Sequence, residues 1–140
     1  MRRTSLGLAI PVFALAIACG TTATSHASTV VLGQHDAGRT VQVRVGDTVQ
    51  VTLEDNFPVP GSALIWSVTS PDVSVLQPGQ VTRTPSVPSG PGSHRTYTAE
   101  FHAMVAGQSV LDALGVTSCE AMAKQFCPNQ EFKITVVVTG

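Results

Sequence analysis

The stretch VRVGDTVQVTLEDNFPVPGSALIW, residues 43–66, contains the pattern from which the fold of the chain can be predicted. Apolar and polar residues alternate from Val49 to Leu53, and a two-residue period is typical of a β-strand with one buried face. The Gly46-Asp47 pair before this strand indicates a tight turn or bend. A segment with two prolines and a glycine follows, and the next apolar run carries the single tryptophan, Trp66. We therefore predict two strands joined by a loop at one end of a β-sandwich, with Trp66 in the core.

The same alternation recurs outside this stretch. Predicted strands cover residues 29–32, 41–45, 49–53, 63–68, 73–76, 81–84, 97–103, 109–114 and 132–136. The run at 73–76 is short, and the run at 81–84 is weaker still. Turn residues separate the strands at intervals of roughly ten residues, which is the spacing of an all-β sandwich. The sequence thus predicts an all-β fold of seven to nine strands.

The N-terminus has the layout of an export signal. Basic residues at Arg2 and Arg3 precede an apolar run from Leu6 to Ala18, and small residues follow it. The run is shorter than the roughly 20 apolar residues that a membrane-spanning helix needs. We therefore expect residues 1–18 to be a signal peptide.

The end of this run, Leu15-Ala16-Ile17-Ala18-Cys19-Gly20, resembles a bacterial lipobox. The resemblance implies that Cys19 is lipidated and that residues 19–28 form a lipidated tether, so that the protein is extracytoplasmic and held at the cell membrane. The alternative is plain secretion, with cleavage after Ala18 or after Ala27. In either case residues 29–140 are expected to form a single domain.

Charge limits the range of partners. The chain carries eight basic and nine acidic residues, a net charge of -1 at pH 7. Loss of residues 1–18 removes Arg2 and Arg3, which leaves six basic residues against nine acidic ones and a net charge of -3. A mildly acidic surface argues against a nucleic-acid partner. We expect a monomer.

Cysteine usage predicts a cross-link. If Cys19 carries lipid, Cys119 and Cys127 remain as a pair in an oxidising compartment, and we predict a disulfide between them. Residues 117–120 also fit a helix capping box. A continuous helix from Cys119 to Cys127 would separate the two by about 12 Å, whereas a disulfide needs Cα atoms within about 7 Å. We therefore expect at most one short helical turn near 118–124.

No set of residues has the pattern of a catalytic or metal site. Paired carboxylates occur at Glu54-Asp55, which we interpret as a solvated strand end. His35, His94 and His102 lie on different segments without metal-ligand spacing, so surface positions are the better interpretation. We expect no enzymatic activity, no metal and no cofactor.

The order of these features resembles a known family. Val45-Gly46-Asp47-Thr48-Val49, then Leu53 to Asn56, a proline and glycine loop and Trp66 are similar to the chagasin-type inhibitors of papain-like cysteine peptidases. The stretch from Gly90 to His94 resembles that family's second glycine-rich loop. The resemblance implies an immunoglobulin-like β-sandwich whose three loops at one end plug an enzyme cleft. It also implies a protein partner of the papain-like cysteine peptidase class.

The sequence departs from that family in two of the three loops. The family's first loop reads Asn-Pro-Thr-Thr-Gly-Tyr-x-Trp, whereas residues 56–66 keep the asparagine, a proline, the glycine and the tryptophan but are three residues longer. The Arg-Pro-Trp of the third loop is missing between Leu111 and Phe132. Residues 117–128 stand in its place, with two cysteines before a valine-rich strand. This arrangement is most similar to small actinobacterial lipoproteins of the same fold.

The first loop has the properties of a binding element. Pro58 and Pro60 fix their own φ angles and favour extended conformations of Phe57 and Val59, so we expect little conformational entropy to be lost on docking. Phe57 is either an apolar anchor for a partner or a cover for the open end of the sandwich. The candidate partner-binding residues are Asn56, Phe57, Pro58, Val59, Pro60, Gly61, Gly92 and His94.

Together these observations predict an exported, membrane-anchored binding module, with inhibition of a cysteine peptidase as its candidate activity. The alternative is a surface lipoprotein with a structural or envelope role and no peptidase target.

Overall fold

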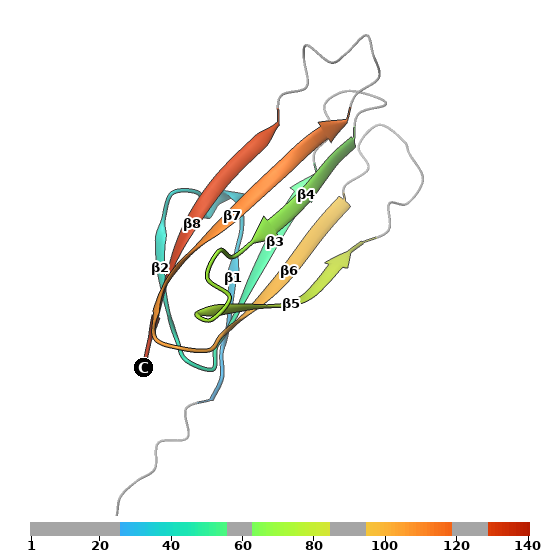
Figure 1. Ribbon diagram of the computed structural model, residues 1–140. Coiled ribbons are helices and arrows are strands. Elements are labelled where there is room, and N and C mark those ends of the chain that lie inside the picture. The colour runs from blue at the N-terminus through green and yellow to red at the C-terminus, as the bar shows by residue number, and fades with distance from the viewer. Residues whose placement is uncertain (1–25, 56–62, 85–94, 119–128) are drawn as a thin grey trace, which may run out of the picture.

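The computed structural model describes residues 26–55, 63–84, 95–118 and 129–140 (Figure 1). In these ranges the chain forms eight strands and one short 3-10 turn. In chain order they are β1 (Thr29–Leu32), η1 (Gln34–Asp36), β2 (Thr40–Arg44), β3 (Thr48–Asp55), β4 (Ala63–Thr69), β5 (Leu76–Arg83), β6 (Arg95–Ala103), β7 (Gly107–Ser118) and β8 (Gln130–Thr139). Across these ranges, no helix has the length and apolar character needed to cross a membrane.

The strands form two four-stranded sheets with the orders β1-β3-β6-β5 and β2-β8-β7-β4. Strand β1 runs parallel to β3, and β2 runs parallel to β8. The other neighbouring strands are antiparallel. The chain leaves edge strand β1 of one sheet, passes through η1 and enters edge strand β2 of the other. The fold is an immunoglobulin-like β-sandwich, which confirms the predicted fold class.

The core lies between the two sheets, where alternate residues of each strand point inward. Val49, Val51 and Leu53 of β3 are completely buried, as the two-residue period predicted. Trp66 of β4 is 1% exposed, which confirms its assignment to the core. Its ring packs edge-on against Phe132 of β8, with ring centroids 5.7 Å apart. Burial of each such side chain stabilises the fold by about 1.5–3 kcal/mol.

The predicted strand at 73–76 is wrong, because residues 73–75 form a turn. The Asp72 carboxylate accepts hydrogen bonds from the Ser74 N–H at 3.1 Å and from the Ser74 hydroxyl at 2.6 Å. The Asp72 carbonyl accepts the N–H groups of Val75 and Leu76. These bonds curl the chain tightly, so the apolar residues here follow a turn and not a strand period.

Strand β5 begins only at Leu76 and ends at Arg83, so the predicted run at 81–84 is the last part of a longer strand. It contains Pro78, and its pairing with β6 shifts register between Pro78 and Val81. A proline is tolerated because β5 is the edge of its sheet, where one row of N–H groups has no strand partner. The proline and the irregularity interrupt the alternation that would have revealed a longer strand.

The strand ends that border residues 56–62, 85–94 and 119–128 lie at one end of the sandwich (Figure 1). In one sheet, Asp55 pairs with Arg95. In the other, Ala63 pairs with Ser118. A hydrogen bond of 3.3 Å from Arg83 Nη2 to the Trp66 carbonyl joins the two sheets near this end. We call this end the loop pole.

The first and last described residues lie at the opposite end, which we call the terminal pole. Thr29 at the start of β1 pairs with Thr48 at the start of β3. Thr139 at the end of β8 pairs with Arg44 at the end of β2. The chain therefore enters the domain at the pole opposite the strand ends that border the three predicted loops.

Candidate functional site at the loop pole

A groove of about 240 Å³ lies at the loop pole between the start of β4 and the facing ends of β5 and β6. We call it the β4–β5 groove. Its lining residues are Leu64, Ile65, Trp66, Arg83, Thr84, Arg95, Thr96 and Tyr97. Small-molecule sites usually measure about 300–1,000 Å³. The β4–β5 groove is thus of a size for one or two side chains of a protein partner.

Two side chains of the other sheet bond to backbone groups on the outer edge of β4 along this groove. β4 is the outer strand of its sheet, so alternate residues direct backbone groups away from β7. The Trp66 carbonyl accepts a hydrogen bond from Arg83 at 3.3 Å. The Val68 N–H donates to the Tyr97 hydroxyl, also at 3.3 Å. The Arg83 guanidinium lies 5.1 Å from the centre of the Tyr97 ring, a cation–π contact that holds the two side chains together.

Trp66 is held in place by close packing beneath the groove. It lies opposite Gly115 of β7, where a Cβ atom would come within 3.0 Å of Trp66 Cζ3. Glycine at position 115 therefore lets the indole lie against the β7 backbone. The Trp66 Nε1 donor has no hydrogen-bond partner among the described residues. A buried donor without a partner costs about 1–3 kcal/mol.

Hydrogen bonds also fix the bases of two of the predicted loops. At the base of segment 85–94, the Thr84 N–H donates to the Thr96 carbonyl at 3.0 Å, and the Thr96 N–H donates to the Thr84 hydroxyl at 2.8 Å. At the base of segment 119–128, the Thr117 N–H donates to Asn129 Oδ1 at 3.1 Å. Strands β5 and β6 thus stay joined up to Thr84 and Thr96. The pairing of β7 with β8 ends at Gly115 and Gln130, and the bond from Thr117 to Asn129 connects the two strands beyond that point.

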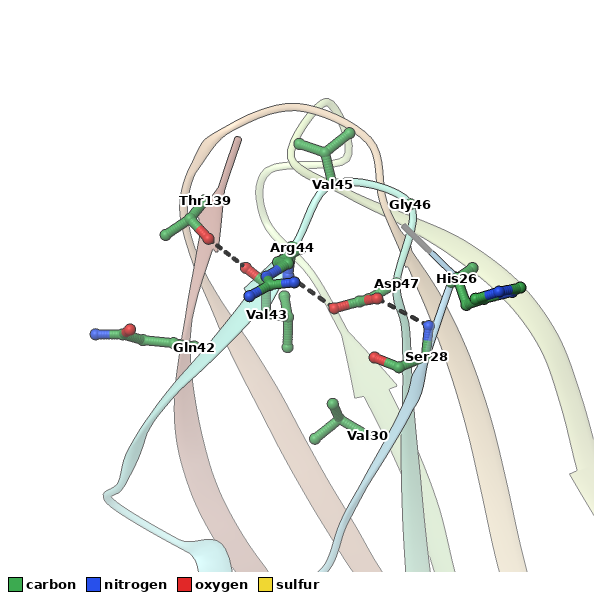
Figure 2. Close-up of a pocket in the computed structure, with 11 residues that line it drawn as sticks. His26, Ser28, Val30, Gln42, Val43, Arg44, Val45, Gly46, Asp47 and Thr139 are labelled. Atoms are coloured by element: carbon green, nitrogen blue, oxygen red, sulfur yellow. Dashed lines mark hydrogen bonds between the residues drawn. The ribbon is translucent and has the colours of Figure 1, made fainter. Parts of the chain in front are cut away.

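The terminal pole contains a larger hollow, of about 560 Å³, in which Asp47 is the central residue (Figure 2). One carboxylate oxygen of Asp47 accepts the Ser28 N–H at 2.9 Å, and the other accepts the Arg44 N–H at 2.8 Å. These bonds, led by the one from Arg44, hold the pKa of Asp47 below its usual value of 3.8. Gly46 beside it has a φ of +94°, which favours glycine. The Gly46-Asp47 pair therefore ties the entering chain to the turn between β2 and β3, which is a structural role.

Of the histidines considered from the sequence, the structure describes His35 and His102, which lie on different elements. His35 lies on η1 with its Nε2 3.0 Å from the buried carboxylate of Asp36. His102 lies on β6 beside Thr48. In the parts of the chain that the structure describes, no group of three His, Cys, Asp or Glu side chains is placed to hold a metal ion. Glu54 near the end of β3 is exposed, in agreement with its interpretation as a solvated residue.

The candidate residues identified from the sequence lie outside the described residues. They are Cys19, Asn56, Phe57, Pro58, Val59, Pro60, Gly61, Gly92, His94, Cys119 and Cys127. Their roles in lipidation, partner binding and the disulfide remain predictions. The same holds for the signal peptide at 1–18 and the helical turn near 118–124. The structure does bring together the strand ends that border the three predicted loops.

Sequence reasoning missed Arg83 and Tyr97. Tyr97 is the single tyrosine of the chain and lies at an inward position of a predicted strand. A buried tyrosine hydroxyl usually finds a hydrogen-bond partner, and this could have identified Tyr97 as a link between elements. Arg83 lies in a run too short to show a period, so the sequence carries no comparable signal for it.

Comparisons with known proteins find similarity in structure alone. Neither models of known protein families nor curated protein sequences match the chain. The cysteine protease inhibitor EhICP2 from Entamoeba histolytica matches at a TM-score of 0.57 and 18% identity, over 81% of this chain and 98% of that one. Amebosin matches at a TM-score of 0.53 and 16% identity, over 81% and 99%. PbICP-C, solved in complex with falcipain-2, matches at a TM-score of 0.51 and 12% identity, over 80% and 99%. At these identities the likeness establishes the fold, and it confirms the chagasin-like sandwich predicted from the sequence.

Proposed function

We propose that this chain is a protein-binding module that inhibits a papain-like cysteine peptidase through its loop pole. One observation carries the proposal. The strand ends bordering segments 56–62, 85–94 and 119–128 lie together at one pole of a fold that a cysteine protease inhibitor shares over nearly its whole length. The complex of PbICP-C with falcipain-2 supports a protein partner for a chain of this fold.

The proposed mechanism is occlusion of the enzyme cleft. The strands below segment 85–94 are paired up to Thr84 and Thr96, and Thr117 is bonded to Asn129 below segment 119–128. Pro58 and Pro60 restrict the backbone of segment 56–62. A binding surface that is rigid before docking loses little conformational entropy on docking. Inhibition of this kind needs no bond of the inhibitor to be cleaved.

The absence of Arg-Pro-Trp changes which residues must fill the cleft. Residues 117–128 carry Cys119 and Cys127 in its place, and we propose that their disulfide shapes this segment. The third contact with the enzyme would then differ from that of the chagasin-type inhibitors, and the range of inhibited enzymes would differ with it. A free-thiol assay on the folded protein tests this part, because two reactive thiols would rule out the cross-link.

The terminal pole suits attachment to a surface. We propose that residues 1–18 are removed and that Cys19 carries lipid, with secretion as the alternative. Because the chain enters at the terminal pole, an anchor there leaves the loop pole directed away from the membrane. Mass spectrometry of the native N-terminus distinguishes a lipidated Cys19 from a cut after Ala18 or Ala27.

Titration of papain with the purified protein tests the proposed activity. We expect saturable loss of papain activity with the wild-type chain and much weaker inhibition by a Phe57→Asp variant. Val45→Asp is the matched control, since Val45 is an exposed apolar residue at the terminal pole and should tolerate a charge without loss of inhibition. Thermal unfolding of both variants checks that they fold. If the wild-type chain does not inhibit papain at micromolar concentrations, a structural or envelope role becomes the better explanation.

A further inference from the structure

We propose that the β4–β5 groove is a separate contact site that receives an acidic side chain of the protein partner, with an apolar residue beside it. That the partner is a peptidase rests on the proposed function. The preference of the groove for an acidic and apolar pair rests on its own residues and can be tested without any peptidase.

The groove lies where a partner that binds both neighbouring segments would cover it. Leu64 and Ile65 on one side are the second and third residues after segment 56–62. Thr84 and Arg95 on the other side border segment 85–94. A partner that contacts both segments therefore passes over the groove between them.

Arg83 gives the groove a positive charge, whereas the chain as a whole is slightly acidic. Arg83 lines it, and the described contacts of Arg83 are with the Trp66 carbonyl and the Tyr97 ring, neither of which carries a charge. Arg95 also lines the groove but lies opposite Asp55 in the pairing of β3 with β6, so the charge open to a partner is that of Arg83. The whole chain, in contrast, carries more acidic than basic residues. Arg83 thus places a positive charge in a groove of an acidic protein, and charge complementarity selects an anionic group.

Arg83 is arranged to recognise a carboxylate. Its bond to the Trp66 carbonyl and its contact with the Tyr97 ring fix the plane of the guanidinium. A guanidinium has five N–H donors, and the bond to Trp66 uses one of them. A guanidinium fixed in this way can donate two parallel hydrogen bonds to a carboxylate with little further loss of entropy.

The expected preference for an apolar residue beside the acidic one rests on the outer face of the sheet that contains β4. Ile65 is 56% exposed and lies directly opposite Val116, which is 45% exposed. Leu114 lies two residues from Val116 on the same face of β7 and is 40% exposed. These three side chains form an apolar surface that begins at the groove. An acidic residue followed by an apolar one matches both features.

Two capped dipeptides test the groove directly. They are N-acetyl-glutamyl-leucine amide and N-acetyl-glutaminyl-leucine amide, which differ in charge but hardly in shape. Trp66 is the single tryptophan and lines the groove, so its fluorescence and its indole N–H resonance report occupancy. We expect saturable binding of the glutamyl peptide at low salt, about 3- to 10-fold tighter than that of the glutaminyl peptide.

Variants identify the arginine responsible. Arg83→Gln should abolish the preference for the glutamyl peptide, and Arg83→Lys should keep part of it, because a lysine retains the charge but not the two parallel bonds. Arg44→Gln is the matched control, since Arg44 is exposed at the terminal pole. Equal affinity for the two peptides, or no saturable change at Trp66, would overturn the proposal.

The outcomes separate this proposal from the proposed function. Preference for the glutamyl peptide without inhibition of papain would support the proposed acidic-residue site and contradict the proposed inhibitor function. Inhibition of papain with equal affinity for both peptides would support the proposed inhibitor function and contradict the proposed acidic-residue site.

Discussion

Replacement of Gly115 by alanine should destabilise the fold, although alanine is normally the better residue in a strand. Gly115 lies opposite Trp66 in the pairing of β4 with β7. A Cβ atom at position 115 would lie 2.9 Å from Leu64 Cδ1, and 3.0 and 3.1 Å from the Trp66 ring carbons Cζ3 and Cε3. Leu64 is itself buried and can give way only in part, and the indole is buried and packed against Phe132, so neither side chain can move without disturbing the core.

Two opposing effects set the size of the change. Alanine has less backbone freedom than glycine in the unfolded chain, which stabilises the variant by about 0.5–1 kcal/mol. Overpacking of a filled core costs about 1–3 kcal/mol. Because the clash outweighs the gain from reduced backbone freedom, we expect a net loss of roughly 0.5–2 kcal/mol in the free energy of unfolding, which corresponds to about 2–8 °C in Tm for a domain of this size.

Urea denaturation followed by Trp66 fluorescence measures this change. A Leu64→Val background is the internal control, because valine has no Cδ atom and removes the 2.9 Å contact while the contacts with the indole remain. The cost of Gly115→Ala should therefore be smaller in that background, with a coupling of about 0.5–1 kcal/mol between the two sites. A Gly115→Ala variant as stable as the wild type would show that the core accommodates the added methyl group and that the indole is not held as tightly as the close contacts indicate.

Three further predictions concern polar contacts. Tyr97→Phe should cost about 1 kcal/mol and speed hydrogen exchange of the Val68 amide, which loses its partner; unchanged exchange would contradict the role of the Tyr97 hydroxyl. Ser109→Ala should cost about 1 kcal/mol in urea denaturation, because the buried hydroxyls of Ser109 and Ser70 lie 2.9 Å apart, and no loss would show that this pair does not stabilise the fold. The pKa of Asp47 is lower in the folded protein than its usual value of 3.8. The Asp47 carboxylate therefore stabilises the fold fully above about pH 3.8, and this stabilisation is lost as the pH falls through the lower pKa of the folded state. The stability gap between wild type and Asp47→Asn should therefore be constant from about pH 5 to 7 and shrink below about pH 4, and a gap that stays the same at about pH 3 would count against this assignment.

The strand pattern was predictable where burial alone determines it. Val49, Val51 and Leu53 alternate with polar residues because one face of β3 meets the core and the other meets water. The prediction failed at 73–76, because the turn there depends on hydrogen bonds from Ser74 to the Asp72 side chain. Periodicity of apolar residues contains no information about such local polar bonds.

The β4–β5 groove could not be predicted from the sequence. It depends on two sheets meeting, so that Arg83 reaches a carbonyl 17 positions earlier and Tyr97 reaches an amide 29 positions earlier in the chain. Both contacts join strands that are not neighbours in any sheet. A pattern within one strand indicates which side chains are buried, but it does not indicate which strand lies across the core.

The same two contacts restrict how a partner can bind near β4. An uncovered edge strand can pair with a strand of another chain through its free backbone groups. On β4 the Trp66 carbonyl and the Val68 N–H are already bonded to Arg83 and Tyr97. A partner strand would have to displace both side chains, and the loss of their two bonds would offset part of the gain from new backbone bonds, at about 0.5–1.5 kcal/mol each. Recognition at this edge is therefore expected to use side chains in the groove and not strand addition, which is the mode of binding that a fixed Arg83 favours.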